Sequence, residues 1–457
     1  MDTTQEWARQ QWGTVELGDK RRNRLAVEMG WQMAEQPEAS LPQQMGSWGS
    51  LKAAYRLLNN PAVSLTALLA PHCRQTRQQA RVERVVLFPE DTTELDYTAH
   101  PSTIGLGPIG DGHGRGMLLH STLAVVPTGR QVLGVAHAEV VLRQKKEAKQ
   151  PKWRQTPEGQ VWQTSAIAVG SPPEGVMWVH VSDRGSDIYE YLTTCRQQHK
   201  QFLIRVFRNR QLVWDEAFET KEETRLLDYA RRLPVQPESD YEVNVAATAK
   251  QPARTAHLVL SWGQVWIAPP QEAPMAIREL EPLHAWVVRA WEPDPPEGAE
   301  RVEWILLTSC PVTTLAEAQQ IVDWYCCRWL CEDFHQCLKT GCRVEHSQLD
   351  DGTDIQRLLG FAIPLAVHLL QLRQAVRAVP DALASDYVEP LQVTLLAKHL
   401  HKNAETMTLA EFWHDVAQLG GHLGRRRDGP PGWRTLWRGW KLLSTWATGA
   451  RLLAASP

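Results

Sequence analysis

Apolar side chains recur with helical spacing between Thr314 and Gly341, and they predict one long amphipathic helix. Thr314 and Glu317 have the spacing of a capping box, and Gly341 stands where the residue after a helix is expected. The face that packs on the core would carry Cys327, Leu330, Phe334 and Leu338. The pattern therefore predicts a rigid helix whose opposite face is free for chemistry.

Helical, polar sequence is also expected at both ends of the chain. Residues 1–75 read as helical, with an amphipathic piece at 50–58 that is stopped by Asn60 and Pro61. From about residue 343 the chain is helical again, and Thr408 with Glu411 has the spacing of a second capping box.

The middle of the chain carries apolar runs of strand length. They predict strands at 82–88, 118–126, 132–141, 176–181 and 202–206. The second and third of these are expected to form a hairpin across residues 127–130, and Ser186 or Asp187 is expected to cap the helix after the fourth. Between about 207 and 303, short β runs at 243–248, 257–262 and 286–291 are separated by proline-rich turns, which indicates an insertion; 304–307 is its last strand. The order of elements predicts an α/β fold.

Composition narrows the class of protein only slightly. The 457 residues have a formal charge of −3, but lysine and arginine cluster at 20–24, 143–154 and 425–441. Such patches allow nucleic-acid binding, although a single charge run is more often solvated surface. Five of the eight cysteines lie between Cys326 and Cys342 without paired spacing, which favours reduced thiols. The N-terminus lacks a signal pattern, and the longest apolar stretch, 358–372, is too short to cross a bilayer, so a soluble cytoplasmic protein is expected.

Three acidic residues stand out by their position. Asp91 follows the first predicted strand, Asp183 follows the fourth, and Glu332 lies on the long helix. If those two strands are neighbours, both aspartates emerge at one edge, and a packed helix could bring Glu332 beside them. Three close carboxylates repel one another and need a divalent cation, for which Mg²⁺ is suited. Two such ions can support in-line phosphoryl displacement. Any one of these acids by itself would more often be a turn residue or a helix cap.

One stripe of the long helix joins Glu332 to cationic and phenolic groups. At about 100° per residue, the four side chains of the stripe fall within an arc of roughly 60°. They are Tyr325, Arg328, Glu332 and Lys339. This arrangement suits a metal-binding carboxylate beside groups that hold phosphate.

Together these residues resemble the DDE transposases of the insertion-sequence-four family, the group that contains the transposon-five transposase. Residues 90–93 are similar to the family's first-aspartate motif, and residues 182–184 with 187–189 to the second. The helical stripe matches the family's Y-x2-R-x3-E-x6-K signature at every spacing. The resemblance covers nearly the whole chain.

The resemblance implies an RNase H-like mixed-sheet catalytic domain at 76–375 that contains the β insertion. It implies a helical DNA end-recognition domain at 1–75 and a helical C-terminal domain at 376–457 that pairs two protomers. The implied activity is cut-and-paste transposition, in which a freed 3′-hydroxyl forms a hairpin before it is joined to target DNA. The implied partners are double-stranded DNA, as inverted-repeat ends and as target, and a second copy of the chain. The expected location is cytoplasmic and nucleoid-associated, without a membrane.

Site roles follow from the same resemblance. Asp91, Asp183 and Glu332 would be the catalytic metal ligands for Mg²⁺, two ions being expected and Mn²⁺ a possible substitute. Tyr325, Arg328 and Lys339 would hold phosphates near a flipped base. Trp304 would stack on that base, although an ordinary place in a strand core is an equal alternative. Arg205 matches a DNA contact of the family.

The terminal domains supply further expected contacts. Basic residues similar to those of the family's end-recognition domain are Arg21, Arg22, Arg24 and Arg56. Which of them read bases and which contact phosphates is left open by the sequence. Residues 419–421 and the spacing Trp433, Trp437, Trp440 resemble the pairing domain, although such a helical tail could equally pack internally.

Two positions depart from the family pattern. Gly185 stands where some relatives carry glutamate, and Pro89 lies inside a strand, where it removes a ladder hydrogen bond unless an edge or bulge absorbs the loss. Three rival classes remain as alternatives. A zinc site at Cys327, Cys331 and His335 is disfavoured because one helix cannot wrap three ligands around an ion. A two-carboxylate glycosidase leaves the cationic stripe unexplained. A transposase-derived nuclease, or a repressor that no longer transposes, keeps the same residues.

Overall fold

Three parallel strands form the centre of the sheet. They are β1 (Val85–Asp96), β5 (Met177–Ser182) and β6 (Gln201–Arg205), and β1 and β6 lie on either side of β5. On one flank β3 (Gly114–Val126) runs antiparallel to β1, and β4 (Gln131–Val141) and β2 (Gly107–Ile109) both pair with β3. The predicted hairpin of β3 and β4 is confirmed, with residues 127–130 in its turn.

The structure is a computed structural model that describes residues 4–144, 157–213, 225–237, 239–245, 252–425, 431 and 433–454. Most of the basic run at 143–154, part of the run at 425–441 and the end of the predicted strand at 243–248 lie outside the described residues.

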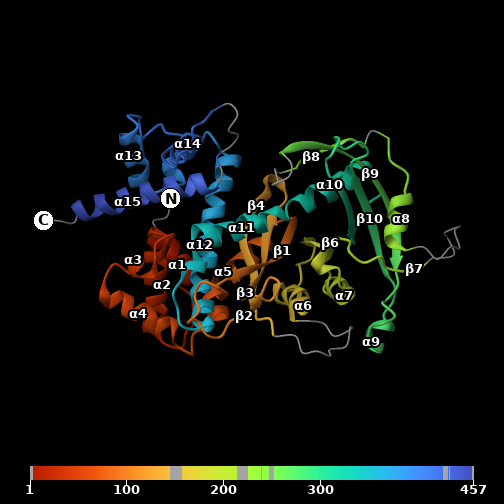
Figure 1. Ribbon diagram of the computed structural model, residues 1–457, viewed down its shortest axis with the longest axis horizontal. Coiled ribbons are helices and arrows are strands. Elements are labelled where there is room, and N and C mark those ends of the chain that lie inside the picture. The colour runs from red at the N-terminus through yellow and green to blue at the C-terminus, as the bar shows by residue number, and fades with distance from the viewer. Residues whose placement is uncertain are drawn as a thin grey trace.

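The insertion continues the same sheet. β11 (Glu303–Thr308) pairs antiparallel with β6 on one side and with β10 (Leu283–Trp291) on the other. β9 (Arg254–Ile267) follows β10, and β7 (Leu212–Val213) and β8 (Tyr241–Val245) pair with β9. Two short helices, α8 (Leu226–Arg232) and α9 (Met275–Arg278), accompany these strands (Figure 1). The last predicted strand of the insertion therefore joins it to the central strands.

Helices cover both faces of the central strands. α6 (Pro157–Val169) and α7 (Tyr189–Gln197) lie on one face, with Trp162 and Leu192 in a cluster that includes Ile204 of β6. α5 (Leu65–Ala80), α11 (Trp329–Gln336) and α12 (Gly352–Ala378) belong to the larger core on the other face (Figure 1). Because buried strands are covered on both sides, their side chains are apolar on both faces, apart from the polar groups described below.

The N-terminal helices are anchored to the core beside the sheet. They are α1 (Thr4–Trp12), α2 (Lys20–Glu35), α3 (Leu41–Met45) and α4 (Trp48–Leu58). Arg357 of α12 donates to the carbonyl oxygens of Leu58 and Val63, both at 2.7 Å, so it holds the last residue of α4 and the connection that follows it. The expected domain boundary at residue 75 falls inside α5, which packs on β4. The C-terminal helices are α13 (Pro390–His399), α14 (Leu409–Leu419) and α15 (Trp433–Ala454), and the capping box of Thr408 and Glu411 is confirmed.

α12 is longer than the apolar run that the sequence shows. By length and composition it could cross a membrane, but 83% of its apolar window, within Gly352–Val376, is buried inside the protein. Its Phe361, Ile363 and Leu370 are almost fully buried, so it is the central helix of the core. All eight cysteines are free thiols, as predicted.

The long helix predicted from Thr314 to Gly341 is interrupted. α10 (Leu315–Cys326) ends before Arg328, α11 follows, and a π-helical turn covers Cys337–Gly341. The capping box at the start of α10 and the burial of the predicted core face are confirmed. The role given to Gly341 is wrong, because the left-handed residue at this end is Arg343, with φ 51°.

Gly341 is required for a packing reason instead. A Cβ atom there would lie 2.6 Å from Cζ2 of Trp437, whose ring is buried against this turn. Gly341→Ala is therefore expected to destabilise the protein by about 1–3 kcal/mol through overpacking. Gly449→Ala is the matched control, since a Cβ there meets nothing within 4 Å and alanine favours the helix by about 0.5–1 kcal/mol. Thermal denaturation of both variants tests this, and a neutral Gly341→Ala would contradict it.

The first strand also differs from its prediction. It does not end at Phe88 but continues through Pro89 and Asp91 to Asp96. Its pairing with β3 is interrupted at Phe88 and Pro89, while the register is unchanged from Leu87 opposite Val125 to Glu90 opposite Thr122. The lack of an N–H on Pro89 is therefore accommodated by a local gap in the β1–β3 ladder. It needs neither an edge strand nor a bulge in this pair of strands.

Candidate active site at the ends of the parallel strands

Asp91 and Asp183 lie side by side because of strand register. β1 and β5 are parallel, and Glu90 is opposite Ser182, so the two following residues are the aspartates. The Asp183 side chain accepts a hydrogen bond from the Gly185 N–H at 2.8 Å and caps a short 3-10 turn. Gly185 at this position leaves room for that contact, since a Cβ there would lie 3.1 Å from Oδ1 of Asp183.

Arg328 joins the acid on the helix to the acid on the strand. Its Nη1 lies 3.2 Å from Oδ2 of Asp91, and its Nη2 lies 3.0 Å from Oε1 of Glu332. The Arg328 side chain is 11% exposed and that of Glu332 is 46% exposed, so the pair extends from the interior to solvent. Nε of Arg328 is buried and has no hydrogen-bond partner. A guanidinium cation thus occupies the gap between two of the three predicted metal ligands.

The Asp91 carboxyl is affected by the charges of the other two acids. Burial raises the pKa of Asp91 to about 6; Arg328 opposes this rise, and the charges of Asp183 and Glu332 add to it. Within the part of the chain that the structure describes, however, no three His, Cys, Asp or Glu side chains are arranged to hold a metal ion.

The raised pKa of Asp91 allows the environment of this carboxyl to be tested without any metal. Because the pKa of folded Asp91 lies above the unfolded value near 3.9, ionisation of Asp91 costs stability as the pH rises from about 4 to about 6. Asp91→Asn should match the wild type near pH 4 and exceed it by about 2–3 kcal/mol at pH 7. Thermal denaturation in chelator across this range measures the difference, and a difference that does not change with pH would rule out the buried, repelled carboxylate.

The remaining signature residues lie around this centre. Tyr325 is buried, and burial raises its pKa, opposed by Arg328 and Arg205. The rings of Trp304 and Tyr325 meet edge to face with centroids 5.6 Å apart. Arg205 donates to the Glu303 carbonyl at 3.0 Å. Trp304 is half-buried in β11, so it lies in a strand without being fully enclosed in the core.

Lys339 is held by a residue that the sequence did not single out. Its Nζ lies 3.6 Å from Oε1 of Glu345, and the same oxygen accepts the Asp96 N–H at 2.9 Å. Lys339 and Arg328, the two cations of the stripe, are therefore both paired with protein carboxylates in this state. No spacing rule in the sequence points to Glu345.

One further expectation is corrected here. Neither Ser186 nor Asp187 caps α7: its N-cap residue is Ile188, which makes no side-chain cap bond. Asp187 is instead a buried acceptor for Arg210, with Oδ1 to Nη2 at 2.6 Å, and for the backbone N–H of Phe207 and Arg208. The zinc site that the sequence disfavours is not assembled among the described residues, and Nε2 of His335 hydrogen-bonds to Ser121 at 2.8 Å.

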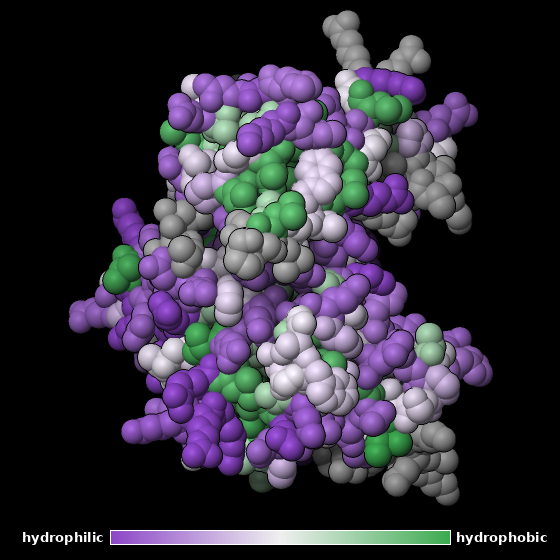
Figure 2. Space-filling view, turned by 90° about the vertical axis from the view of Figure 1, so that its left-hand side faces the viewer, coloured by the Kyte–Doolittle hydropathy of each residue, from purple (hydrophilic) through white to green (hydrophobic). Residues whose placement is uncertain are grey.

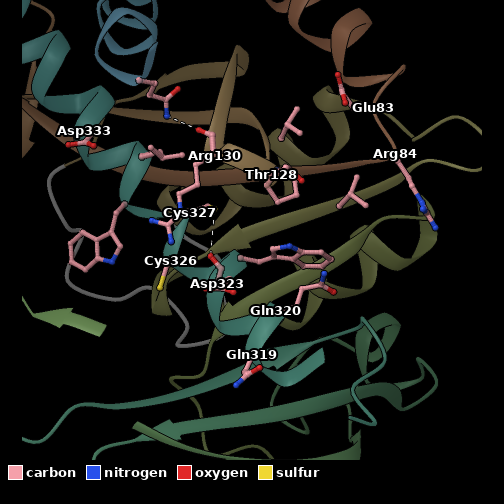
Figure 3. Close-up of a pocket in the computed structure, with 18 of the residues that line it drawn as sticks. Glu83, Arg84, Thr128, Arg130, Gln319, Gln320, Asp323, Cys326, Cys327 and Asp333 are labelled. Carbon is pink, nitrogen blue, oxygen red and sulfur yellow. Dashed lines mark hydrogen bonds between the residues drawn. The ribbon is translucent and has the colours of Figure 1, made fainter. Parts of the chain in front are cut away.

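A hollow of about 980 Å³ lies near the start of β1, away from the two aspartates. Figure 3 shows Glu83 and Arg84, Thr128 and Arg130 of the β3–β4 turn, and Asp323 and Cys327 around it. Cys327 lines this hollow, whereas the neighbouring Arg328 reaches Asp91. The site is therefore a surface formed at strand ends, and the hollow is separate from it.

The N-terminal arginines lie on two helices. Arg21 and Arg24 of α2 and Arg56 of α4 are exposed. Arg22 is partly committed to the fold, because its Nη1 donates to the Leu17 carbonyl at 2.7 Å. Asp19 caps α2 by accepting from the Arg21 N–H at 2.6 Å.

Comparison with protein families now adds to this geometry. Residues 4–63 match the family described as transposase DNA-binding, and residues 179–367 match the transposase DDE domain. The chain therefore contains a transposase DNA-binding domain and a transposase DDE domain. The matched DDE domain contains Asp183, Glu332 and all four residues of the helical stripe, and the DNA-binding match contains the four N-terminal arginines. A mixed sheet with helices on both faces and at both ends, in a chain with a DDE domain, confirms the predicted RNase H-like α/β fold.

One buried acid near the site was not assigned a role by sequence reasoning. Glu90, next to Asp91, is fully buried. Burial opposes its ionisation, but His180 and His120 outweigh burial and hold the pKa of Glu90 well below its usual range. The available signal was a second acid directly beside a catalytic candidate, close behind the apolar residues 85–88.

Proposed function

We propose that this chain is a Mg²⁺-dependent DNA transposase of the cut-and-paste type, related to the insertion-sequence-four group. The observation that carries the proposal is the contact of Arg328 with Asp91 and Glu332, beside Asp183, in a chain that has a transposase DNA-binding domain and a DDE domain. The expected intermediate is a DNA hairpin at the transposon end.

Asp91, Asp183 and Glu332 would hold the metal. The donor set fits, because carboxylate oxygens are the ligands that Mg²⁺ prefers, and a cation already bridges Asp91 and Glu332 in the form of Arg328. When bound, two Mg²⁺ ions, or Mn²⁺ in their place, would assist the attacking and leaving oxygens of phosphodiester cleavage. Entry of the metal requires the Arg328 side chain to leave this gap.

The protein's own side chains would position the DNA. Arg328, once released, and Lys339 would bind phosphates, the first through a planar fork and the second as a point charge. Tyr325 and Arg205 would complete the phosphate contacts. Trp304, already against the Tyr325 ring, would stack on a flipped base, a contact worth roughly 1–3 kcal/mol.

The terminal regions would bind the transposon end and a second protomer. Exposed Arg21, Arg24 and Arg56, with Arg22, are the proposed contacts to the inverted repeat, within a recognition domain at 1–75. The proposed catalytic domain is 76–375, and the C-terminal domain, 376–457, would form the homodimer. α15 leaves Leu442 and Leu453 45% and 80% exposed, and Figure 2 shows apolar surface among hydrophilic side chains over the C-terminal helices. We place the protein in the cytoplasm, on the nucleoid, without a membrane.

The test uses a DNA duplex with the inverted repeat that flanks this coding sequence. In Mg²⁺, the full-length protein should nick the repeat end, form a hairpin and join the end to a second DNA, and binding should weaken steeply with salt. Binding without cleavage would indicate a repressor, and cleavage without joining would indicate a nuclease; either result replaces the proposed function.

A further inference from the structure

The acid beside Asp91 lies on the opposite face of the sheet. Successive strand residues point to opposite faces, so Asp91 faces α11 while Glu90 and Thr92 face α6 and α7. Glu90 is fully buried, and so are its neighbours on that face, His120 and Thr122 of β3 and His180 of β5. Burying an acid in such a place costs folding free energy unless both carboxylate oxygens have hydrogen-bond or charged partners.

Both oxygens of Glu90 have partners on three different elements. Oε1 accepts from the hydroxyl of Tyr191 on α7 and lies 3.1 Å from Nδ1 of His180. Oε2 accepts from Oγ1 of Thr122 at 3.3 Å and lies 3.5 Å from Nε2 of His120. Glu90 therefore ties β1 to both neighbouring strands and to the helix that follows Asp183.

The residue on the other side of Asp91 is tied to the same group. Oγ1 of Thr92 lies 2.9 Å from Nδ1 of His120, the ring whose other nitrogen faces Glu90. Asp91 is thus flanked by two residues whose side chains are held on the buried face. Its own carboxylate is further oriented by the Thr92 N–H, which donates to Oδ1 at 2.7 Å.

Ordinary packing does not require this arrangement. Val86 and Phe88, four and two residues before Glu90 in β1, fill the same face with apolar side chains. The polar groups begin where the strand reaches the active-site edge, and the gap in the ladder at Phe88 and Pro89 leaves the backbone there with fewer bonds to β3. A buried anchor at Glu90 compensates for that gap directly before Asp91.

We propose that Glu90 is a positioning residue for the metal-binding aspartate. Its bonds to Tyr191, His180 and Thr122 fix the β1 backbone so that the Asp91 carboxylate faces Asp183 and α11. This inference rests on the proposed function, because it assigns Glu90 a role toward the same metal site. Glu90 itself touches neither metal nor DNA.

The test compares two tyrosines on one helix. Tyr191→Phe removes the hydroxyl that donates to Glu90 and keeps the ring, and Glu90→Gln removes the charge and keeps the shape. Tyr189→Phe is the matched control: Tyr189 lies two residues away on α7, is equally buried, and donates to the Glu281 carbonyl at 2.9 Å, outside the Glu90 group. Mn²⁺ affinity of each full-length protein, measured by calorimetry without DNA, is the readout, together with thermal stability.

The expected result is that Tyr191→Phe weakens Mn²⁺ binding about 10-fold, as loss of an outer partner of a metal site does, and that Glu90→Gln weakens it at least as much. Tyr189→Phe should bind Mn²⁺ like the wild type even where it loses similar stability. Binding within twofold of wild type in folded Tyr191→Phe overturns the positioning role, whether or not Glu90→Gln folds. A wild type that binds Mn²⁺ no better than Asp91→Ala overturns the metal site itself, and with it the proposed function.

Discussion

Glu332→Ala is expected to abolish Mg²⁺-dependent nicking and strand transfer while leaving inverted-repeat binding nearly intact. A catalytic metal supplies several kcal/mol, and each 1.36 kcal/mol is tenfold in rate, so the loss should be on the order of 10³-fold or more. The fold should tolerate the change, because the Glu332 side chain is 46% exposed and exposed ion pairs contribute little to stability.

Asp333→Ala is the matched control for this experiment. It removes the next acid on α11, whose Oδ1 pairs with Nη1 of Arg373 at 2.8 Å, away from the Asp91 contact. Nicking by both variants is measured on the same repeat duplex, with binding followed separately by gel shift. Full activity in Glu332→Ala would remove this residue from the site, and equal losses in both variants would point to the helix and not to the carboxylate.

Arg328→Ala is expected to reduce hairpin formation more than first-strand nicking. The proposed role of Arg328 is to hold a phosphate near the flipped base. Loss of one such positioned donor lowers the rate of the step it assists by about 10²–10³-fold. A smaller, opposite effect is expected on metal binding: with the guanidinium gone from between Asp91 and Glu332, a divalent cation no longer competes with it. Mn²⁺ affinity without DNA should therefore rise in this variant.

Arg328→Lys separates the two effects. It keeps a positive charge but loses the planar fork, so hairpin formation should stay impaired while Mn²⁺ affinity returns toward that of the wild type. Single-turnover rates of nicking and hairpin formation on the repeat duplex distinguish the steps. Equal losses in both steps would contradict the clamp role.

The main elements could be predicted from the sequence because their signals are local. Apolar runs of strand length predicted the hairpin of β3 and β4 and the strands β5 and β6, and each is confirmed. The spacing of Thr and Glu predicted the capping boxes at Thr314 and Thr408, which are confirmed as well. The register of two parallel strands then brings Asp91 beside Asp183, as expected for neighbouring strands. The family comparisons support the transposase reading of the same motifs.

Element ends were less predictable. β1 passes through Pro89 because pairing with β5 continues on the other side of the strand, where Pro89 is opposite Val181. The helix break at Arg328 could not be predicted, because no glycine or proline lies near it in the sequence. The sequence rule places a helix end at Gly341. The structure instead shows that a side chain at Gly341 would collide with the ring of Trp437, nearly one hundred residues later in the chain.

By itself, the sequence determined which residues carry charge and at what spacing along each helix and strand, because these patterns depend only on local geometry. Tertiary structure alone decided that Arg328 lies between two carboxylates, that Glu345 holds Lys339, and that Glu90 is buried among groups from β3, β5 and α7. Most of these contacts join residues that are far apart in the chain. Which partner a side chain finds therefore depends on how the helices pack on the sheet. The physical reason is burial: in the low-dielectric interior a charge must find a partner, and only the packed fold determines which one is within reach.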